Sequence, residues 1–180
     1  EYLNNITPEI EEISYQLASL EMAYNGTTCF LEANVIDTDI AASAVEKIGI
    51  RAVIGTPGIK DIYEENSYFG PIKFNTNRAF DLIDRELTRN QNENALVQGA
   101  ISLHGMGTAS DELLLHAKSI ADKNNVIINM HQSYAEDDTA SDYNRFKQHP
   151  MIHYEEIGFL GPNCTFAHVN FVRDEEIPPI

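Results

Sequence analysis

The stretch that decides the fold is LVQGAISLHGMGTASDELLLHAKSIADKNNVIINMH, residues 96–131. Its β-branched and apolar ends predict strands over residues 96–104 and 126–131. Between them, apolar residues recur at steps of three and four, which is typical of a helix with one buried face. Ser110 or Thr108 supplies the N-cap of this helix. A strand, a helix and a second strand in this order favour two parallel strands joined by a right-handed crossover.

The same alternation continues in both directions. Further strands are predicted over residues 27–33, 50–55 and 164–168. Further helices are predicted from Thr7 to Gly26, around residues 40–48 and 80–87, and from Pro150 to Gly158. Residues 56–75 are expected to form a loop, which would be too long for a plain connector. The acidic stretch Glu136–Asp142 is expected as a polar lead into the last helix. The fold class is therefore α/β, with parallel strands and helical crossovers.

Two architectures share this alternation, a closed barrel and an open sheet covered on both faces. In the strand over residues 96–104, Ile101 and Leu103 lie on one face, whereas Gln98, Ser102 and His104 lie on the other. A barrel has helices only on its outside and tolerates polar residues on its inner face near the rim. The face pattern favours a (β/α)8 TIM barrel. A whole barrel has eight strands and about 250 residues, so we expect a partial one.

The composition narrows the classes of partner. A formal charge of −16 and a pI near 4.6 argue against nucleic acid and against anionic membrane surfaces. No apolar run approaches the roughly 20 residues of a membrane span. Cys29 and Cys164 lie in strand-like runs and are too few for a disulfide framework, which favours a reducing compartment and a cytoplasmic protein. A small-molecule substrate is the expected partner.

Three of the six histidines end predicted strands, namely His104, His131 and His168. A single histidine at the end of an element is more often a structural residue than a ligand. The carboxyl ends of parallel strands, however, converge on one rim, where barrel enzymes place their chemistry. Imidazole is the commonest metal ligand and changes its charge near neutral pH. Three histidines in register therefore predict a shared pocket, and we expect the other three on the surface.

Several stretches of the sequence resemble one protein family. NMHQSYAEDD and IGFLGPNCTFAHVNFVRDEEI look like the strand-five to strand-six region of the amidohydrolase superfamily, in particular its cytosine deaminase, guanine deaminase and triazine chlorohydrolase branch. GTTCFLEAN and EKIGIRAVIG resemble its strands two and three, and SLHGMGTASDELL its strand four with the next helix. The resemblance implies a metal-dependent barrel of which residues 1–180 form strands two to six. Strand one and strands seven and eight are then absent, and the chain is expected to be an internal piece of a longer enzyme.

The resemblance also implies roles for individual residues. His131 matches the strand-five metal ligand, and His168 matches the strand-six histidine, which contacts the bound water or ligates a second metal. His104 resembles a residue that contacts the substrate. The implied cofactor is a divalent metal, zinc before others. The implied reaction is attack by a metal-activated water on a C–N or C–halogen bond of a heterocycle or cyclic amide.

At two places this chain departs from the family pattern, and both bear on its expected activity. Where the family has a proton-shuttling glutamate three residues after the strand-five histidine, this chain has Tyr134. Glu136 is the nearest carboxylate and is the candidate catalytic replacement, with a solvated surface acid as the alternative. The chain has no His-x-His, which the family carries on strand one. The piece alone is therefore expected to be inactive.

Two other functions compete with the hydrolase. The first is a non-catalytic half-barrel, either a pseudoenzyme or an interaction module that has lost its metal. The second is a flavodoxin-like domain, which is disfavoured because GTPGIK, residues 55–60, lacks the Gly-Lys-Ser/Thr of a phosphate-binding loop. Open strand edges also predict association of the isolated chain, which leaves room for a homo-oligomer.

Overall fold

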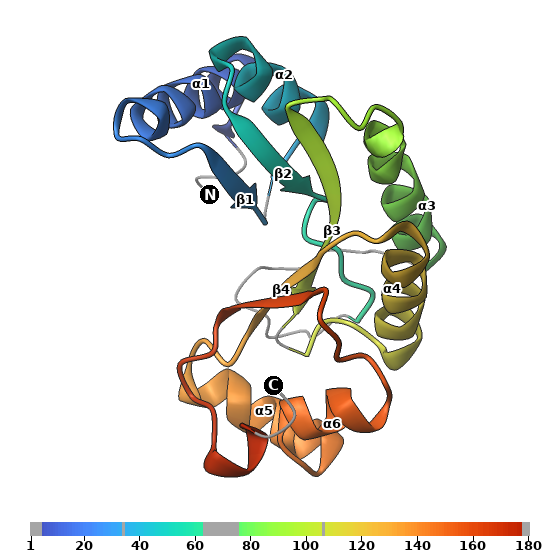
Figure 1. The fold of residues 1–180 in the computed structure, drawn as a ribbon. Coiled ribbons are helices and arrows are strands. Elements are labelled where there is room, and N and C mark those ends of the chain that lie inside the picture. The colour runs from blue at the N-terminus through green and yellow to red at the C-terminus, as the bar shows by residue number, and fades with distance from the viewer. Residues whose placement is uncertain (1–4, 34, 63–75, 106, 178–180) are drawn as a thin grey trace.

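The computed structural model describes residues 5–33, 35–62, 76–105 and 107–177. In this part of the chain, five strands form one sheet whose spatial order follows the sequence, and every neighbouring pair is parallel. The strands are β1 (Cys29–Glu32), β2 (Arg51–Gly55), β3 (Val97–Gly105), β4 (Ile128–Gln132) and β5 (Cys164–His168). The sheet curls, and the helices lie along the outside of the curve (Figure 1). The predicted α/β partial barrel is confirmed, whereas the barrel strands assigned to residues 1–180 stay a prediction.

The helices fill the intervals between the strands, and the two for which a cap was predicted, α1 and α4, begin there. They are α1 (Pro8–Tyr24), α2 (Thr38–Ile48), α3 (Thr76–Leu87), α4 (Asp111–Asn124), α5 (Glu136–Phe146) and α6 (Pro150–Glu156), with short 3-10 turns η2 (Thr88–Gln91) and η3 (Asp174–Glu176). The hydroxyl of Thr7 accepts a hydrogen bond from the backbone N–H of Ile10 at 3.3 Å. Ser110, rather than Thr108, caps α4 by accepting from Leu113 N–H at 3.1 Å. No described helix has the length and apolar character that crossing a membrane requires.

Helix α5 differs from the prediction, because the acidic stretch was expected as a polar lead rather than a helix. The Asp138 carboxylate accepts hydrogen bonds from the backbone N–H groups of the N-cap residue Ala135 and of Tyr134 before it, which fixes the entry of the chain into the helix. Three acidic residues in the first turn also stabilise the helix, because their negative charges lie at the positive end of its dipole. The residues that α5 buries, Thr139 and Asp142, are polar. The sequence of α5 therefore shows little apolar periodicity. Residues 63–75 of the predicted long loop lie outside the described residues.

The larger hydrophobic core lies on the outer side of the curled sheet. Ile101 and Leu103 of β3 and Met130 of β4 pack there against α3, α4 and α6. Because successive side chains of a strand alternate in direction, Ser102 and His104 occupy the opposite, inner face. A second, smaller core joins α2 to β2 and the start of β3. The apolar outer face and polar inner face are the arrangement that the barrel prediction required.

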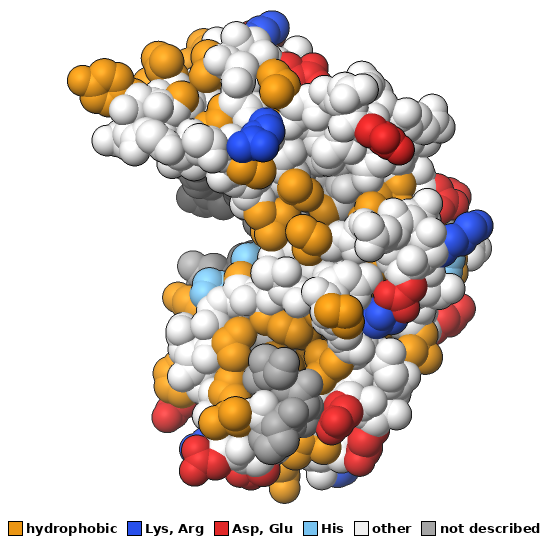
Figure 2. Space-filling model, viewed as in Figure 1, with side chains coloured by type: hydrophobic (Ala, Val, Ile, Leu, Met, Phe, Trp, Pro, Cys, Tyr) orange, Lys and Arg blue, Asp and Glu red, His pale blue; other side chains and the backbone are white. Residues whose placement is uncertain are grey.

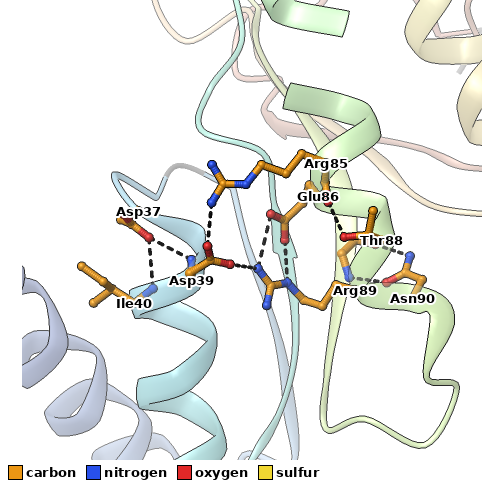
Figure 3. Close-up of polar contacts among 9 residues, drawn as sticks. Asp37, Asp39, Ile40, Arg85, Glu86, Thr88, Arg89 and Asn90 are labelled. Atoms are coloured by element: carbon orange, nitrogen blue, oxygen red, sulfur yellow. Dashed lines mark hydrogen bonds and ion pairs between the residues drawn. The ribbon is translucent and has the colours of Figure 1, made fainter. Parts of the chain in front are cut away.

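Ion pairs outside the sheet hold α2 against the end of α3 and η2 (Figure 3). The Asp39 carboxylate on α2 binds Arg85 at 2.6 Å and Arg89 at 2.9 Å. Arg89 also donates from Nε to the buried Glu86 carboxylate at 2.8 Å. Since Arg89 serves both carboxylates, the network positions neighbouring crossover helices relative to one another at the amino end of β3.

Candidate functional site

The three strand-ending histidines lie next to one another. His104 is near the end of β3, His131 is the residue before the last in β4, and His168 is the last residue of β5. The ring centroids of His104 and His131 are 6.1 Å apart, and those of His131 and His168 are 5.2 Å apart. Histidine side chains are visible at the lower lip of the hollow that divides the molecule in Figure 2. The strand ends therefore bring together all three predicted site histidines.

The closest approach in this group joins His131 and His168. Nδ1 of His131 and Nε2 of His168 are 3.2 Å apart, and the rings are nearly parallel. In the strand register His168 pairs with Gln132, whose side chain is buried on the helix side of the sheet. At His168 the backbone turns into the left-handed region, with φ of +78°, and Val169 follows with +53°. Such a conformation is unfavourable for residues other than glycine and is enriched at functional sites.

Burial sets the charge of two of the three rings. The pKa of His104 is lowered to about 4, first by burial and then by repulsion from Lys60 and from the protonated form of His131. The pKa of His131 is also lowered, first by burial and then by its neighbour His168. Both rings are therefore neutral near pH 7, and the neutral imidazole is the form that binds a metal. Lys60 itself is buried, and burial lowers its pKa.

The donor set can be compared with what zinc requires. A tetrahedral zinc site with Zn–N distances of about 2.0–2.1 Å places its ligand nitrogens about 3.3 Å apart. The 3.2 Å separation of His131 Nδ1 and His168 Nε2 fits two ligands of one such ion, although a hydrogen bond between the rings has the same length. Among residues 5–33, 35–62, 76–105 and 107–177, no three His, Cys, Asp or Glu side chains form a metal-binding set. The two imidazoles fit part of a zinc site and do not complete one.

Glu136 lies apart from this group. It is the first residue of α5, and its side chain lines a pocket of about 430 Å³ between α5 and the segment after β5, together with His149 and Arg173. None of the three strand-ending histidines lines that pocket. Within the described ranges, no hydrogen bond or ion pair joins Glu136 to those histidines. The catalytic role of Glu136 stays a prediction that this geometry does not favour.

Tyr134 occupies the place beside His168 instead. Its ring lies edge-on to the His168 ring, with centroids 4.8 Å apart, and more than half of its surface is exposed. Sequence reasoning noted Tyr134 only as a departure from the family pattern. Its spacing of three residues from His131 was the signal that could have identified it as a site residue.

The remaining histidines are half-buried rather than fully on the surface, so that expectation is wrong. His116 stacks on Phe80 with ring centroids 3.6 Å apart. His153 stacks on Phe146 at 3.9 Å and lies 2.9 Å from an Asp111 carboxylate oxygen. His149 lies 3.3 Å from Glu175. Each ring is used in packing between elements, as is common for single histidines.

Comparisons with known proteins agree with this architecture. The family model described as "Amidohydrolase family" matches residues 1–180. The chain is 31% identical over 174 residues to 5-methylthioadenosine/S-adenosylhomocysteine deaminase of Thermodesulfovibrio yellowstonii, covering 96% of this chain and 37% of that protein. It is 30% identical over 161 residues to 5'-deoxyadenosine deaminase of Methanopyrus kandleri, covering 89% and 35%. The chain thus spans little more than a third of the length of these relatives.

Solved structures show the same fold at lower identity. An adenosine deaminase from Xanthomonas campestris with bound zinc superposes with a TM-score of 0.74 at 23% identity, covering 97% of this chain and 38% of that one. Atrazine chlorohydrolase TrzN from Arthrobacter aurescens TC1, complexed with zinc, gives 0.79 at 19% identity, covering 98% and 41%. These likenesses establish the partial barrel.

Proposed function

Because this chain is a member of the amidohydrolase family, we propose that the intact protein hydrolyses a C–N bond of an aminated heterocycle and releases ammonia. The observation that carries the proposal is the meeting of His104, His131 and His168 at successive strand ends. Two relatives are named as deaminases of 5-methylthioadenosine or S-adenosylhomocysteine and of 5'-deoxyadenosine. Adenosine derivatives are therefore the first substrates to test, and halogenated heterocycles are the second.

We propose His131 and His168 as ligands of a divalent cation, with zinc as the first choice. Their nitrogen separation of 3.2 Å and the lowered pKa of His131 both support this assignment. A bound zinc ion acidifies water, and so supplies a strong nucleophile near neutral pH. The left-handed backbone at His168 turns its ring toward His131, which places both donors on the same side of the sheet.

The other side chains at the mouth would bind the substrate, orient the attacking water and transfer a proton. His104 is buried and neutral, so one ring nitrogen can donate and the other can accept a hydrogen bond from a heterocycle. His168 can also hold the attacking water or stabilise charge that develops on it. Tyr134 lies beside His168, where its hydroxyl could transfer a proton that the family pattern assigns to a glutamate. Glu136 is the competing candidate for this proton transfer.

The free thiols fit the proposed location of the protein. Cys29 and Cys164 form no disulfide with one another. Unpaired cysteines are typical of a reducing compartment, which supports a cytoplasmic protein acting on a small molecule.

A non-catalytic half-barrel is the second candidate. Tyr134 favours it, because a glutamate is the usual proton carrier at that position in the family pattern and a phenolic hydroxyl is a less common one. Such a protein would still bind heterocycles at the same mouth and would release no ammonia.

The test uses the intact protein and three variants, with ammonia release from adenosine derivatives and zinc content as readouts. His131→Ala is expected to lose both the zinc and the activity. Tyr134→Phe is expected to lower kcat by about 10²–10⁴-fold if the phenol transfers a proton, because that is the usual contribution of such a group. Glu136→Gln is the matched comparison and is expected to retain activity. Normal activity and zinc content in His131→Ala would overturn the proposal.

A further inference from the structure

A buried polar network lies directly behind the histidines, on the helix side of the sheet. Gln132 follows His131 in β4, and its side chain is fully buried. Its Nε2 donates to an Asp142 carboxylate oxygen at 2.7 Å, and its Oε1 accepts from the Tyr154 hydroxyl at 2.8 Å. Both partners are themselves buried. The end of β4 is therefore joined to α5 and α6 through one amide whose donor and acceptor are both used.

The same network reaches the strand that carries His168. The backbone carbonyl of Gln132 accepts from Val169 N–H at 3.0 Å. Val169 is the second of the two residues in the left-handed conformation at the end of β5. Gln132 thus fixes the point at which the chain turns the His168 ring toward His131.

Arg145, one turn after Asp142 on α5, holds the loop that follows β3. Its guanidinium donates to the backbone carbonyls of Gly107 and Ala109, the latter at 3.0 Å. Gly107 has φ of +73°, and a Cβ placed there would lie 2.5 Å from an Asp142 carboxylate oxygen. Only glycine permits this approach of the loop to α5. Gly107 lies three residues after His104, so the contact with Arg145 also restrains the strand end that carries the third histidine.

We propose that Asp142 and Arg145 are positioning residues, which hold the His104, His131 and His168 strand ends in the relative placement that catalysis requires. This inference rests on the proposed hydrolase function. Neither residue is placed at the substrate or the cation. Asp142 acts through the side chain of Gln132, and Arg145 acts through the backbone carbonyls of the loop after β3. Helix α5 then holds the ends of β3, β4 and β5 in place relative to one another. Displacement of catalytic groups by about 1 Å can cost two orders of magnitude in rate, and loss of groups that support ligands typically costs 10–100-fold.

The alternative is that the network only stabilises the fold. Glu86 offers a matched control, because it is also a buried carboxylate with a side-chain hydrogen-bond partner, which in its case is Arg89. Its backbone carbonyl lies against Gly99, five residues before His104 in β3 and so about 16 Å along the strand. Glu86→Gln should therefore affect stability without moving the histidines.

The experiment compares Arg145→Met, Arg145→Lys and Asp142→Asn with Glu86→Gln in the intact protein, at a temperature where circular dichroism shows all four folded. Arg145→Met and Asp142→Asn are expected to lower kcat by 10–100-fold with little change in KM, and to weaken zinc retention against a chelator. Arg145→Lys, which can hold one carbonyl, is expected to recover part of kcat. Glu86→Gln should keep wild-type kcat, KM and zinc affinity. If Arg145→Met does not fold, Arg145→Lys and Asp142→Asn carry the test.

Two outcomes separate this inference from the proposed function. Wild-type kcat and zinc affinity in the α5 variants, alongside an inactive His131→Ala, would overturn the positioning role alone. An active His131→Ala would overturn the hydrolase assignment. In that case the ¹⁵N chemical shifts of the imidazoles still test the positioning role of α5. Arg145→Met should shift the His104 and His131 signals, and Glu86→Gln should not. Unchanged shifts in Arg145→Met would overturn it.

Discussion

Helices α1 and α4 have the same sequence pattern and opposite surroundings. Both carry apolar residues at steps of three and four. On α4, Leu113 and Leu114 are almost fully buried against β3 and β4. On α1, Ile13 and Leu17 are more than 60% exposed and Tyr24 is 90% exposed. Apolar side chains accordingly gather at the upper left of Figure 2, where Figure 1 places α1.

The difference arises from the neighbours of each helix. Helix α4 covers two strands that are paired on both sides, whereas α1 packs mainly on α2, and β1 is at the edge of the described sheet. The side of α1 that meets α2 uses the buried residues Glu11 and Ser19. The Glu11 carboxylate accepts hydrogen bonds from the backbone of Ile36 and Asp37 just before α2. Periodicity thus predicts that a helix forms but does not predict what covers its apolar face.

The largest effect expected from this comparison is on stability. Leu114→Ala should lower the free energy of unfolding by about 2–5 kcal/mol, because it opens a cavity in the larger core. Leu17→Ala, the matched change on α1, should cost no more than about 0.5 kcal/mol in the chain of residues 1–180, because its side chain is exposed. Urea titrations of both variants measure this. Equal losses would mean that the α1 face is buried in solution, for example by association of chains.

A smaller effect concerns the ion pairs that join α2 to α3. The guanidinium of Arg89, and then that of Arg85, hold the pKa of Asp39 below its usual value. A lowered folded pKa stabilises the fold above the unfolded pKa of about 4, and this contribution disappears as the pH falls through the folded pKa. Asp39 is largely exposed, so Asp39→Asn should cost only about 0.2–1 kcal/mol at pH 7.

That difference between wild type and Asp39→Asn should shrink toward pH 3 and in 1 M salt, which screens exposed charges. Unfolding titrations at both pH values provide the check. A difference that stays constant as the pH falls would show that Asp39 acts through something other than its charge.

Much of the fold could be predicted from local signals. Each of the five strands lies within its predicted range or overlaps it closely, because parallel strands are short runs of β-branched residues between turn signals. The caps Thr7 and Ser110 were readable because side-chain oxygens at those places satisfy open N–H groups. Helix α5 was missed because its buried side is polar, and its buried Asp142 is paired across the fold with residues far away in sequence.

The candidate site could be predicted only in part. Register alone brings His104 and His131 to one rim, since both lie on the inner face near the ends of paired strands. Simple alternation would put His168 on the face of Gln132, and the turn that redirects it depends on tertiary hydrogen bonds. The displacement of Glu136 into a separate pocket follows from the start of α5, which sequence reasoning did not anticipate.

We propose above that His131 and His168 bind one cation at the mouth of the curled sheet. Anomalous diffraction at the zinc edge, from crystals of the zinc-loaded intact protein, tests it most directly. We predict a peak about 2.0–2.1 Å from both His131 Nδ1 and His168 Nε2. A zinc peak remote from both rings, in crystals of active protein, would contradict it.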